Sequence, residues 1–177
     1  MKNGVKNVLR YGSIVACFVL CVFSYALYER TFVGWQVPLT VAAAAAALTA
    51  PLAVGFWGRL TGSDSRLLNY VCHVCFAGAL GAFVFLGVNR FGADRSAVYE
   101  REFTVAEKIT ATRDRYRRVG RRSVRSGSYR VYYLRLASED GTVKKIPVTQ
   151  ALYNKVRSGG TVTFSMYDGR FGYPVIE

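Results

Sequence analysis

A stretch of 22 residues without a charged side chain, Leu67 to Val88, constrains this chain more than any other feature. At about 1.5 Å rise per residue, a helix of that length reaches about 33 Å, enough to cross the hydrocarbon core of a bilayer. The segment therefore predicts a membrane-spanning helix over residues 67–88. It joins an apolar N-terminal half to a basic C-terminal half, so we expect a membrane anchor followed by an extramembrane domain.

Two further apolar segments come earlier in the chain. Residues 11–28 form an uncharged run after a basic tail, residues 1–10, which holds three basic residues and no acid. A second uncharged run, residues 35–57, begins and ends with tryptophan, a side chain that prefers the two interfaces of a bilayer. The expected fold class is therefore membrane α-helical, with three transmembrane helices in residues 11–89.

The first apolar run has a second interpretation, as a cleaved signal. Ser24 and Ala26 have the small side chains and the spacing that a signal peptidase recognises, and Cys17 lies in a lipoprotein-like pattern. Little hydrophobic sequence precedes Cys17, and bulky residues surround Ala26. We therefore favour a retained helix, and cleavage of residues 1–26 stays open.

After residue 89 the hydrophobic period changes from that of helices to that of strands. Following a linker at residues 90–97, residues 98–177 are predicted to form a small, mostly β domain. Residues 99–112 are predicted to form one or two strands, and further strands are predicted at residues 129–138, 142–148, 161–167 and 172–176, with a hairpin turn at Glu139-Asp140-Gly141. A short helix at about residues 149–158 has Thr149 as its N-cap. Short strands at this density favour an open barrel of the OB or SH3 type.

The order of elements in residues 143–175 resembles that of NfeD-like bacterial proteins, in which a few membrane helices precede a small β domain. The pattern consists of a strand, one helical turn, Ser158-Gly159-Gly160, the strand Val162-Thr163-Phe164, and the strand Gly172 to Val175 of the form Gly-x-Pro-Val. This resemblance implies a binding or scaffolding module rather than a catalyst, and it carries no functional residue across.

Basic residues concentrate in one tract of the C-terminal half. Residues 113–130 contain eight arginines and a single acid. Arginine pairs bidentately with phosphate, so the tract suits anionic headgroups or another polyanion. The predicted anionic-partner residues are Arg113, Arg115, Arg117, Arg118, Arg121, Arg122, Arg125, Arg130 and Tyr116, and Tyr129 offers a second stacking surface. The alternative is a long, solvated hairpin loop without a dedicated partner.

All four cysteines lie in apolar segments, so the C-terminal domain has no disulfide framework. If the first and third spans run in the same direction, their cysteines lie at similar depth. The candidate metal or redox residues are Cys17, Cys21, Cys72, His73 and Cys75, which suit zinc, copper or a thiol pair. Packing of cysteine as a small apolar side chain is favoured instead, so we predict no metal and no cofactor.

Small side chains in the third span predict helix packing. Ala77 and Gly81, and likewise Gly78 and Ala82, are small residues four apart, which allow helices to approach closely in lipid. We expect them to contact the second span or another copy of the chain. The alanine-rich second span is expected to lie between the other two.

No catalytic constellation is found. Residues 90–177 contain no His and no Cys, which excludes His-based triads and thiol nucleophiles there. We therefore expect no enzyme, but an integral membrane anchor that displays a basic small β-barrel as an interaction or assembly module beside the bilayer. The alternatives are a membrane redox or metal-handling protein and a membrane-tethered nucleic-acid binder.

Loop charges favour one orientation only narrowly. The undiluted basic residues in the N-terminal tail favour a cytoplasmic N-terminus, which places the C-terminal domain outside the cytoplasm. The expected location is thus an inner membrane if the source is bacterial. Expected partners are membrane lipid, anionic headgroups or an envelope polymer, and a protein partner or second copy, whereas nucleic acid is disfavoured.

Overall fold

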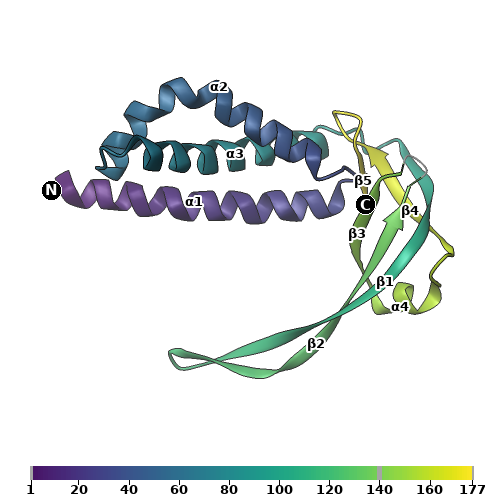
Figure 1. The fold of residues 1–177 in the computed structure, drawn as a ribbon. Coiled ribbons are helices and arrows are strands. Elements are labelled where there is room, and N and C mark those ends of the chain that lie inside the picture. The colour runs from purple at the N-terminus through teal and green to yellow at the C-terminus, as the bar shows by residue number, and fades with distance from the viewer. Residues whose placement is uncertain (1, 139–140, 177) are drawn as a thin grey trace. The chain divides into compact units, whose positions relative to one another are not determined.

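The computed structural model of the chain describes residues 2–138 and 141–176, with the backbone alone at residues 2, 3, 5, 6 and 52–54. Three long helices come first (Figure 1): α1 (Lys2–Arg30), α2 (Gln36–Thr61) and α3 (Arg66–Phe91). Five strands and a short helix follow: β1 (Val98–Val119), β2 (Arg122–Ala137), β3 (Val143–Val148), α4 (Gln150–Lys155), β4 (Thr161–Asp168) and β5 (Pro174–Ile176). The predicted change from helices to strands after residue 89 is confirmed.

Two of the helices, α1 and α3, are long and apolar enough to cross a membrane. The apolar part of α1 is Asn7–Arg30, with 24 residues, and α3 has 26 residues. These lengths correspond to about 36 Å and about 39 Å at the helical rise. Residues 2–10, predicted as a basic tail, form the first turns of α1.

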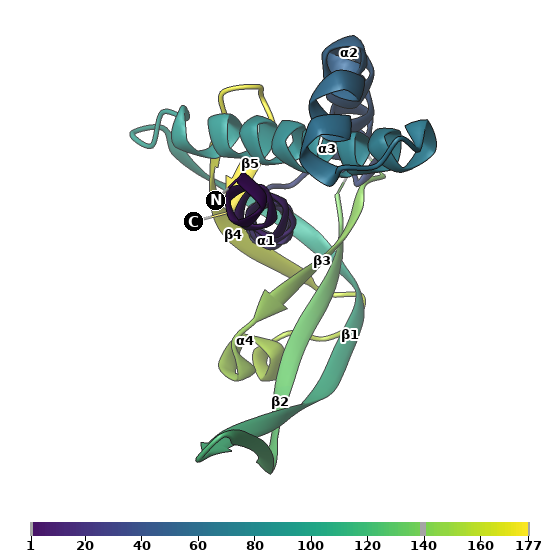
Figure 2. The same ribbon diagram turned by 90° about the vertical axis from the view of Figure 1, so that its left-hand side faces the viewer.

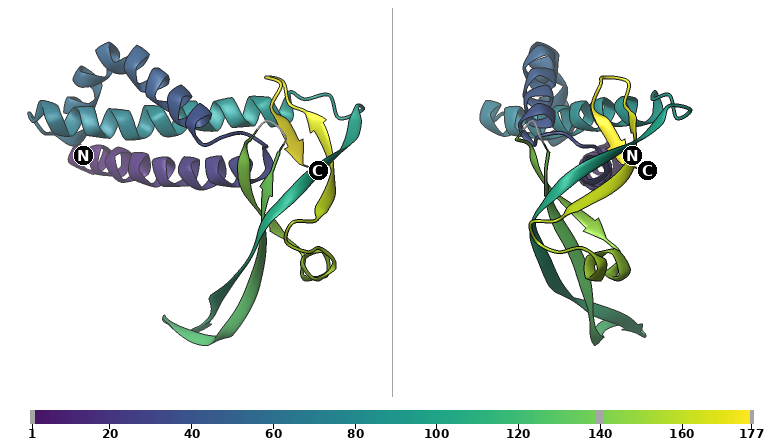
Figure 3. Two further views of the ribbon diagram at one scale, coloured as in Figure 1. Left: turned by 45° about the vertical axis from the view of Figure 1, so that its right-hand side comes forward. Right: turned by 90° about the vertical axis from the view of Figure 1, so that its right-hand side faces the viewer.

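The second apolar segment is not a straight helix. Its two parts, Gln36–Pro51 and Gly55–Thr61, meet at 89° (Figure 3). Pro51 lies at the end of the first part, where proline provides no N–H for the helix and its ring crowds the preceding turn. The described chain thus holds two helices that meet the length and hydropathy of a span, and a third if the bent pair counts as one.

The middle helix of the bundle is α3, which contacts both α1 and α2, whereas α1 and α2 hardly touch. The expectation that the alanine-rich α2 lies between the other two is therefore wrong. Glycines of α3 permit its close contact with α2: a Cβ built on Gly81 would lie 2.6 Å from the Ala45 Cβ, and one on Gly78 would lie 3.7 Å from the Ala42 Cβ. The closest backbone approach thus uses glycine on α3 and alanine on α2.

The strands form one open sheet in the order β3-β2-β1-β4-β5. Strands β1 and β2 pair antiparallel from Thr104↔Ala137 to Val119↔Arg122, and β3 pairs antiparallel with β2 only as far as Tyr132↔Val148. Beyond the last pair between β2 and β3, residues 112–130 of β1 and β2 continue as a two-stranded ribbon (Figure 2). The sheet is therefore broad at one end and a twisted hairpin at the other.

By contacts the chain divides into two compact units. One comprises Met1–Ala97 with Tyr167–Val175, and the other comprises Val98–Met166 with Ile176–Glu177. Residues 167–175, predicted as part of the domain at 98–177, thus group with the helices.

Asn89 holds this returning segment against the helices and is itself fully buried. Its Nδ2 donates to the Tyr173 carbonyl at 2.9 Å, and its Oδ1 accepts from the Phe171 N–H at 3.0 Å. Phe85 stacks on Phe171 with ring centroids 5.3 Å apart and planes at 4°. One buried amide of α3 therefore bonds two backbone groups of this turn.

The second unit has a small core beneath the sheet. Its fully buried side chains are Phe103, Val105, Leu134, Leu136 and Met166. The Thr149 side chain accepts from the Leu152 N–H at 3.3 Å, which confirms the predicted N-cap of α4, although α4 itself is shorter than predicted. In the predicted turn between β2 and β3, Gly141 has φ 78°, while Glu139 and Asp140 lie outside the described residues.

Candidate anion-binding hairpin

The arginine tract, residues 113–130, forms the distal half of the β1–β2 hairpin. Pairing continues from Arg113↔Tyr129 to Val119↔Arg122, so only two residues make the turn. Gly120 has φ 60°, and no other type of residue in the described chain has a positive φ, a combination typical of a type II′ turn. The tract is exposed, as expected for a loop, but its backbone forms two paired strands, which corrects the loop interpretation.

The register sorts the arginines between two faces. Directly opposite residues of an antiparallel pair share a face, and successive residues of one strand alternate. One face, called the arginine face below, carries Arg113, Arg115, Arg117 and Arg122. The opposite face carries Asp114, Tyr116, Arg118, Arg125 and Arg130, and Arg121 lies in the turn. The structure thus divides the nine predicted residues instead of gathering them at one site.

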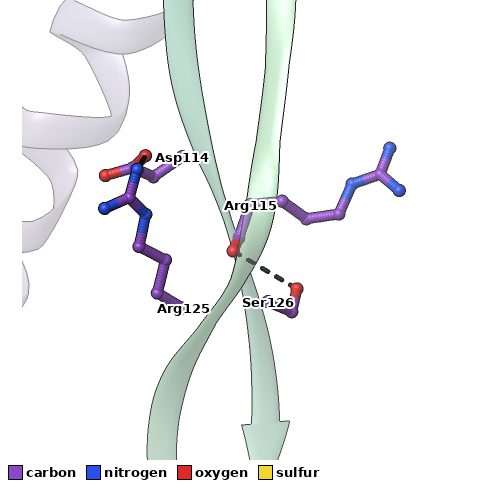
Figure 4. A network of polar contacts seen from close by, with 4 residues as sticks. All are labelled: Asp114, Arg115, Arg125 and Ser126. Carbon is purple, nitrogen blue, oxygen red and sulfur yellow. Dashed lines mark hydrogen bonds and ion pairs between the residues drawn. The ribbon is translucent and has the colours of Figure 1, made fainter.

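A β-bulge at Ser126 sets this division. Arg115 pairs with Gly127 and Tyr116 pairs with Arg125, which leaves Ser126 without an opposite residue. The Ser126 hydroxyl donates to the Arg115 carbonyl at 3.3 Å (Figure 4). Because a bulge adds one residue to one strand, the alternation of β2 shifts there and places Arg125 beside Asp114.

The only acid of the tract lies on the opposite face. Asp114 Oδ1 is 2.6 Å from a terminal guanidinium nitrogen of Arg125, while the Arg115 side chain points the other way (Figure 4). Within the described residues, no carboxylate forms an ion pair with any member of the arginine face. That face therefore carries four positive charges that no neighbouring acid compensates.

Tyrosines hold two of these guanidinium groups. The Arg115 guanidinium carbon lies 5.9 Å from the centre of the Tyr129 ring, and Arg113 donates to the Tyr133 hydroxyl at 2.9 Å. Lys145 Nζ lies 4.1 Å from the centre of the same Tyr133 ring, so the basic surface continues onto β3. Aromatic contacts of this kind orient a cation and leave most of its N–H groups free for an anion. Sequence patterns did not single out Lys145 or Tyr133, although Tyr133 shares the alternation of Tyr129.

The base of the hairpin is anchored by α4 (Figure 2). Lys108 Nζ donates to the Val156 carbonyl at 2.7 Å and lies 4.3 Å from the centre of the Tyr153 ring. Tyr153 also packs on Tyr132, with centroids 4.8 Å apart. The hairpin thus combines a fixed base with a distal half in which every residue from 112 to 130 is exposed.

The four cysteines line one apolar groove of about 380 Å³, formed by α1 and α3 with Trp57. The Cys17 thiol donates to the Cys75 carbonyl at 3.6 Å, and all four thiols are free. In the described part of the chain, no three His, Cys, Asp or Glu residues are grouped as a metal site requires. The groove brings Cys17, Cys21, Cys72 and Cys75 together as apolar lining.

His73 faces α2 rather than the cysteine groove. Its Nε2 lies 3.1 Å from the Ala46 carbonyl and 3.1 Å from the Thr49 hydroxyl. A carbonyl oxygen only accepts, so Nε2 carries the proton in this contact. His73 is buried and thereby bonds the backbone of α2 just before Pro51.

The small residues of α3 occupy different surroundings. Gly78 and Gly81 face α2, as described above. Ala77 lines an open groove of about 390 Å³ together with His73, and Ala82 lines another of about 450 Å³ together with Ser24 of α1. Two of the four predicted packing residues therefore make the close helix contact.

Comparison with known proteins finds no matching family model, no matching curated protein and no matching solved structure. The similarity to NfeD-like proteins stays a prediction. The geometry of the hairpin therefore carries the functional proposal.

Proposed function

We propose that the chain is an integral membrane anchor whose sheet domain displays the hairpin as a binding module for an anionic partner beside the bilayer. The observation that carries this proposal is the arginine face, with four exposed arginines and no acid. Guanidinium groups donate bidentately to phosphate and carboxylate oxygens, which favours partners that repeat such groups.

The electrostatic attraction of the arginine face is of the size that gives a weak, reversible contact. Each Lys or Arg near an anionic membrane surface contributes about 1 kcal/mol. Four arginines on one face therefore supply about 4 kcal/mol, without counting Lys145 at its base. Anionic headgroups and an acidic envelope polymer present this chemistry at high density.

In this proposal α1, the bent α2 and α3 together form three spans, with the N-terminus in the cytoplasm and the sheet domain outside it. The membrane is the inner membrane if the source is bacterial. The sheet is assigned to the open barrels of the OB or SH3 type, in keeping with the layout shared with NfeD-like proteins. Labelling Ser158→Cys from one side of the membrane tests the orientation, because residue 158 is exposed whereas Ser138 is buried.

Binding of vesicles tests the module directly. The full chain is placed in nanodiscs of neutral phosphatidylcholine and mixed with vesicles of phosphatidylcholine alone or with about a third phosphatidylglycerol. The proposal predicts capture of the anionic vesicles only, and a loss of at least about tenfold in affinity when the four arginines of the arginine face are changed to Gln. Equal capture of both vesicles, or preference for single-stranded nucleic acid, would contradict it.

A further inference from the structure

The tip of the hairpin carries exposed valines among its arginines. Val119 pairs with Arg122, and Val124 pairs with Arg117. Each of the last two residue pairs on the arginine face therefore consists of one valine and one arginine. Val119 is 60% exposed and Val124 is 50% exposed. Two apolar side chains thus lie side by side with two guanidinium groups at the most distant point of the hairpin.

The valines beside the arginines favour one class of anionic partner over another, whereas arginines alone would bind either. A soluble polyanion supplies anionic groups for the guanidinium groups, but it supplies no apolar environment for an exposed valine. The surface of an anionic bilayer offers phosphate at the level of the headgroups and apolar material a few ångströms below it. Tyr129 lies on the same face, and tyrosine is enriched at that level because its ring is apolar and its hydroxyl is polar.

We propose that the arginine face lies flat on an anionic lipid surface, with Val119 and Val124 entering the interface while Arg117 and Arg122 bind headgroup phosphates. The proposal rests on the proposed function and names its partner. A flat orientation follows from the register, since Asp114 on the opposite face is then turned away from the negative surface. An end-on orientation would instead immerse both faces of the tip.

Neighbouring positions on the two faces give the sharpest test. Val124 and Ser123 are adjacent and exposed, but Ser123 pairs with Arg118 on the opposite face. Val124→Cys and Ser123→Cys are each labelled with an environment-sensitive fluorophore, in a full chain whose four native cysteines are changed to Ala. One arm uses nanodiscs that contain phosphatidylglycerol, and the other adds anionic vesicles to neutral nanodiscs.

The label at residue 124 is expected to shift to shorter emission wavelengths and to be quenched by spin-labelled lipid, and the label at residue 123 is not. A shift in the first arm assigns the docking to the protein's own bilayer, and one in the second arm to an apposed membrane. Equal responses at the two positions, or none at residue 124, would overturn the proposal.

A second measurement needs no change to the native cysteines. Val119→Ser with Val124→Ser is expected to lower affinity for anionic vesicles about tenfold, as partial burial of two valines implies. The control is Val143→Ser, at a valine of β3 that is 56% exposed. Unchanged vesicle binding would refute entry of the valines while leaving the arginine-based function intact, whereas vesicle binding that ignores the arginines too would refute both. Binding of a single-stranded oligonucleotide that outcompetes the vesicles and requires the arginines but not the valines would reassign the face to a soluble polyanion.

Discussion

Asp114 and Arg125 form an ion pair of 2.6 Å across the two strands of the hairpin, on the side opposite to the Arg115 side chain (Figure 4). This pair places the only carboxylate of the arginine tract where it neutralises a charge of the opposite face. The arginine face therefore keeps four charges without an acid, whereas one charge of the opposite face is neutralised. Substitutions on the two faces can test this difference.

Removing the carboxylate should change little. Asp114→Asn is expected to lower the free energy of unfolding by less than about 1 kcal/mol, because both partners are substantially exposed. Affinity for anionic vesicles should also stay nearly constant. Adding a carboxylate to the arginine face by Val124→Asp is the matched comparison, and it should reduce vesicle affinity at least about tenfold. Equal effects of the two substitutions would argue against a one-sided surface.

The contact between α2 and α3 should be sensitive to one methyl group. Gly81→Ala is expected to destabilise the helices by about 1–3 kcal/mol, because the new Cβ would lie 2.6 Å from the Ala45 Cβ. Gly87→Ala is the control on the same helix, since its added Cβ would have no atom within 4 Å besides the neighbouring backbone of α3 itself. Thermal unfolding in detergent measures both variants. A stable Gly81→Ala chain would mean that α2 does not pack there.

Asn89 should control the returning segment. Asn89→Ala removes the acceptor of the Phe171 N–H and one of the two donors to the Tyr173 carbonyl, which still accepts from the Gly169 N–H. The expected cost is about 2 kcal/mol. Amide hydrogen exchange in residues 169–173 should become faster, while exchange in the hairpin should not. Asn154→Ala, at an exposed position of α4, serves as control. Unchanged exchange at residues 169–173 would show that the segment is held without the Asn89 side chain, by main-chain bonds such as Arg170 N–H to the Asn89 carbonyl and by the aromatic stacking.

The cysteines are expected to be dispensable for binding. A chain with Cys17, Cys21, Cys72 and Cys75 all changed to Ala should bind anionic vesicles as the parent does, because these residues line an apolar groove. The purified parent should contain no stoichiometric zinc or copper. A bound metal, or loss of activity in the substituted chain, would favour the metal-handling alternative.

The local patterns predicted what local physics determines. An uncharged run long enough to cross a bilayer predicted α3, and the alternation from Tyr129 to Tyr133 predicted the central part of β2. The strands of the arginine tract were missed because its eight arginines interrupt the alternation of apolar and polar residues that indicates a strand. The two-residue turn that begins at Gly120 was not recognised either. Nothing but the pairing register reveals which arginines share a face.

Contacts between distant parts of the chain could not be predicted in this way. The Asn89 side chain bonds the Tyr173 carbonyl, which lies 84 residues later in the chain. No sequence pattern around either residue indicates this contact. The close contact of α3 with α2 depends on glycines that face alanines of the other helix. Small residues in α3 predicted that a contact exists, but not which helix of the three lies in the middle.

The most direct test of the account compares two triple variants that remove equal charge. One changes Arg115, Arg117 and Arg122 of the arginine face to Gln, and the other changes Arg118, Arg125 and Arg130 of the opposite face. Affinity of the full chain for anionic vesicles is measured over a range of salt concentrations. The account predicts that the first variant loses at least about tenfold in affinity and much of its salt dependence, and that the second loses less than about threefold. Equal losses in the two variants would mean that the hairpin acts through its net charge alone, and would contradict a binding surface built on one face.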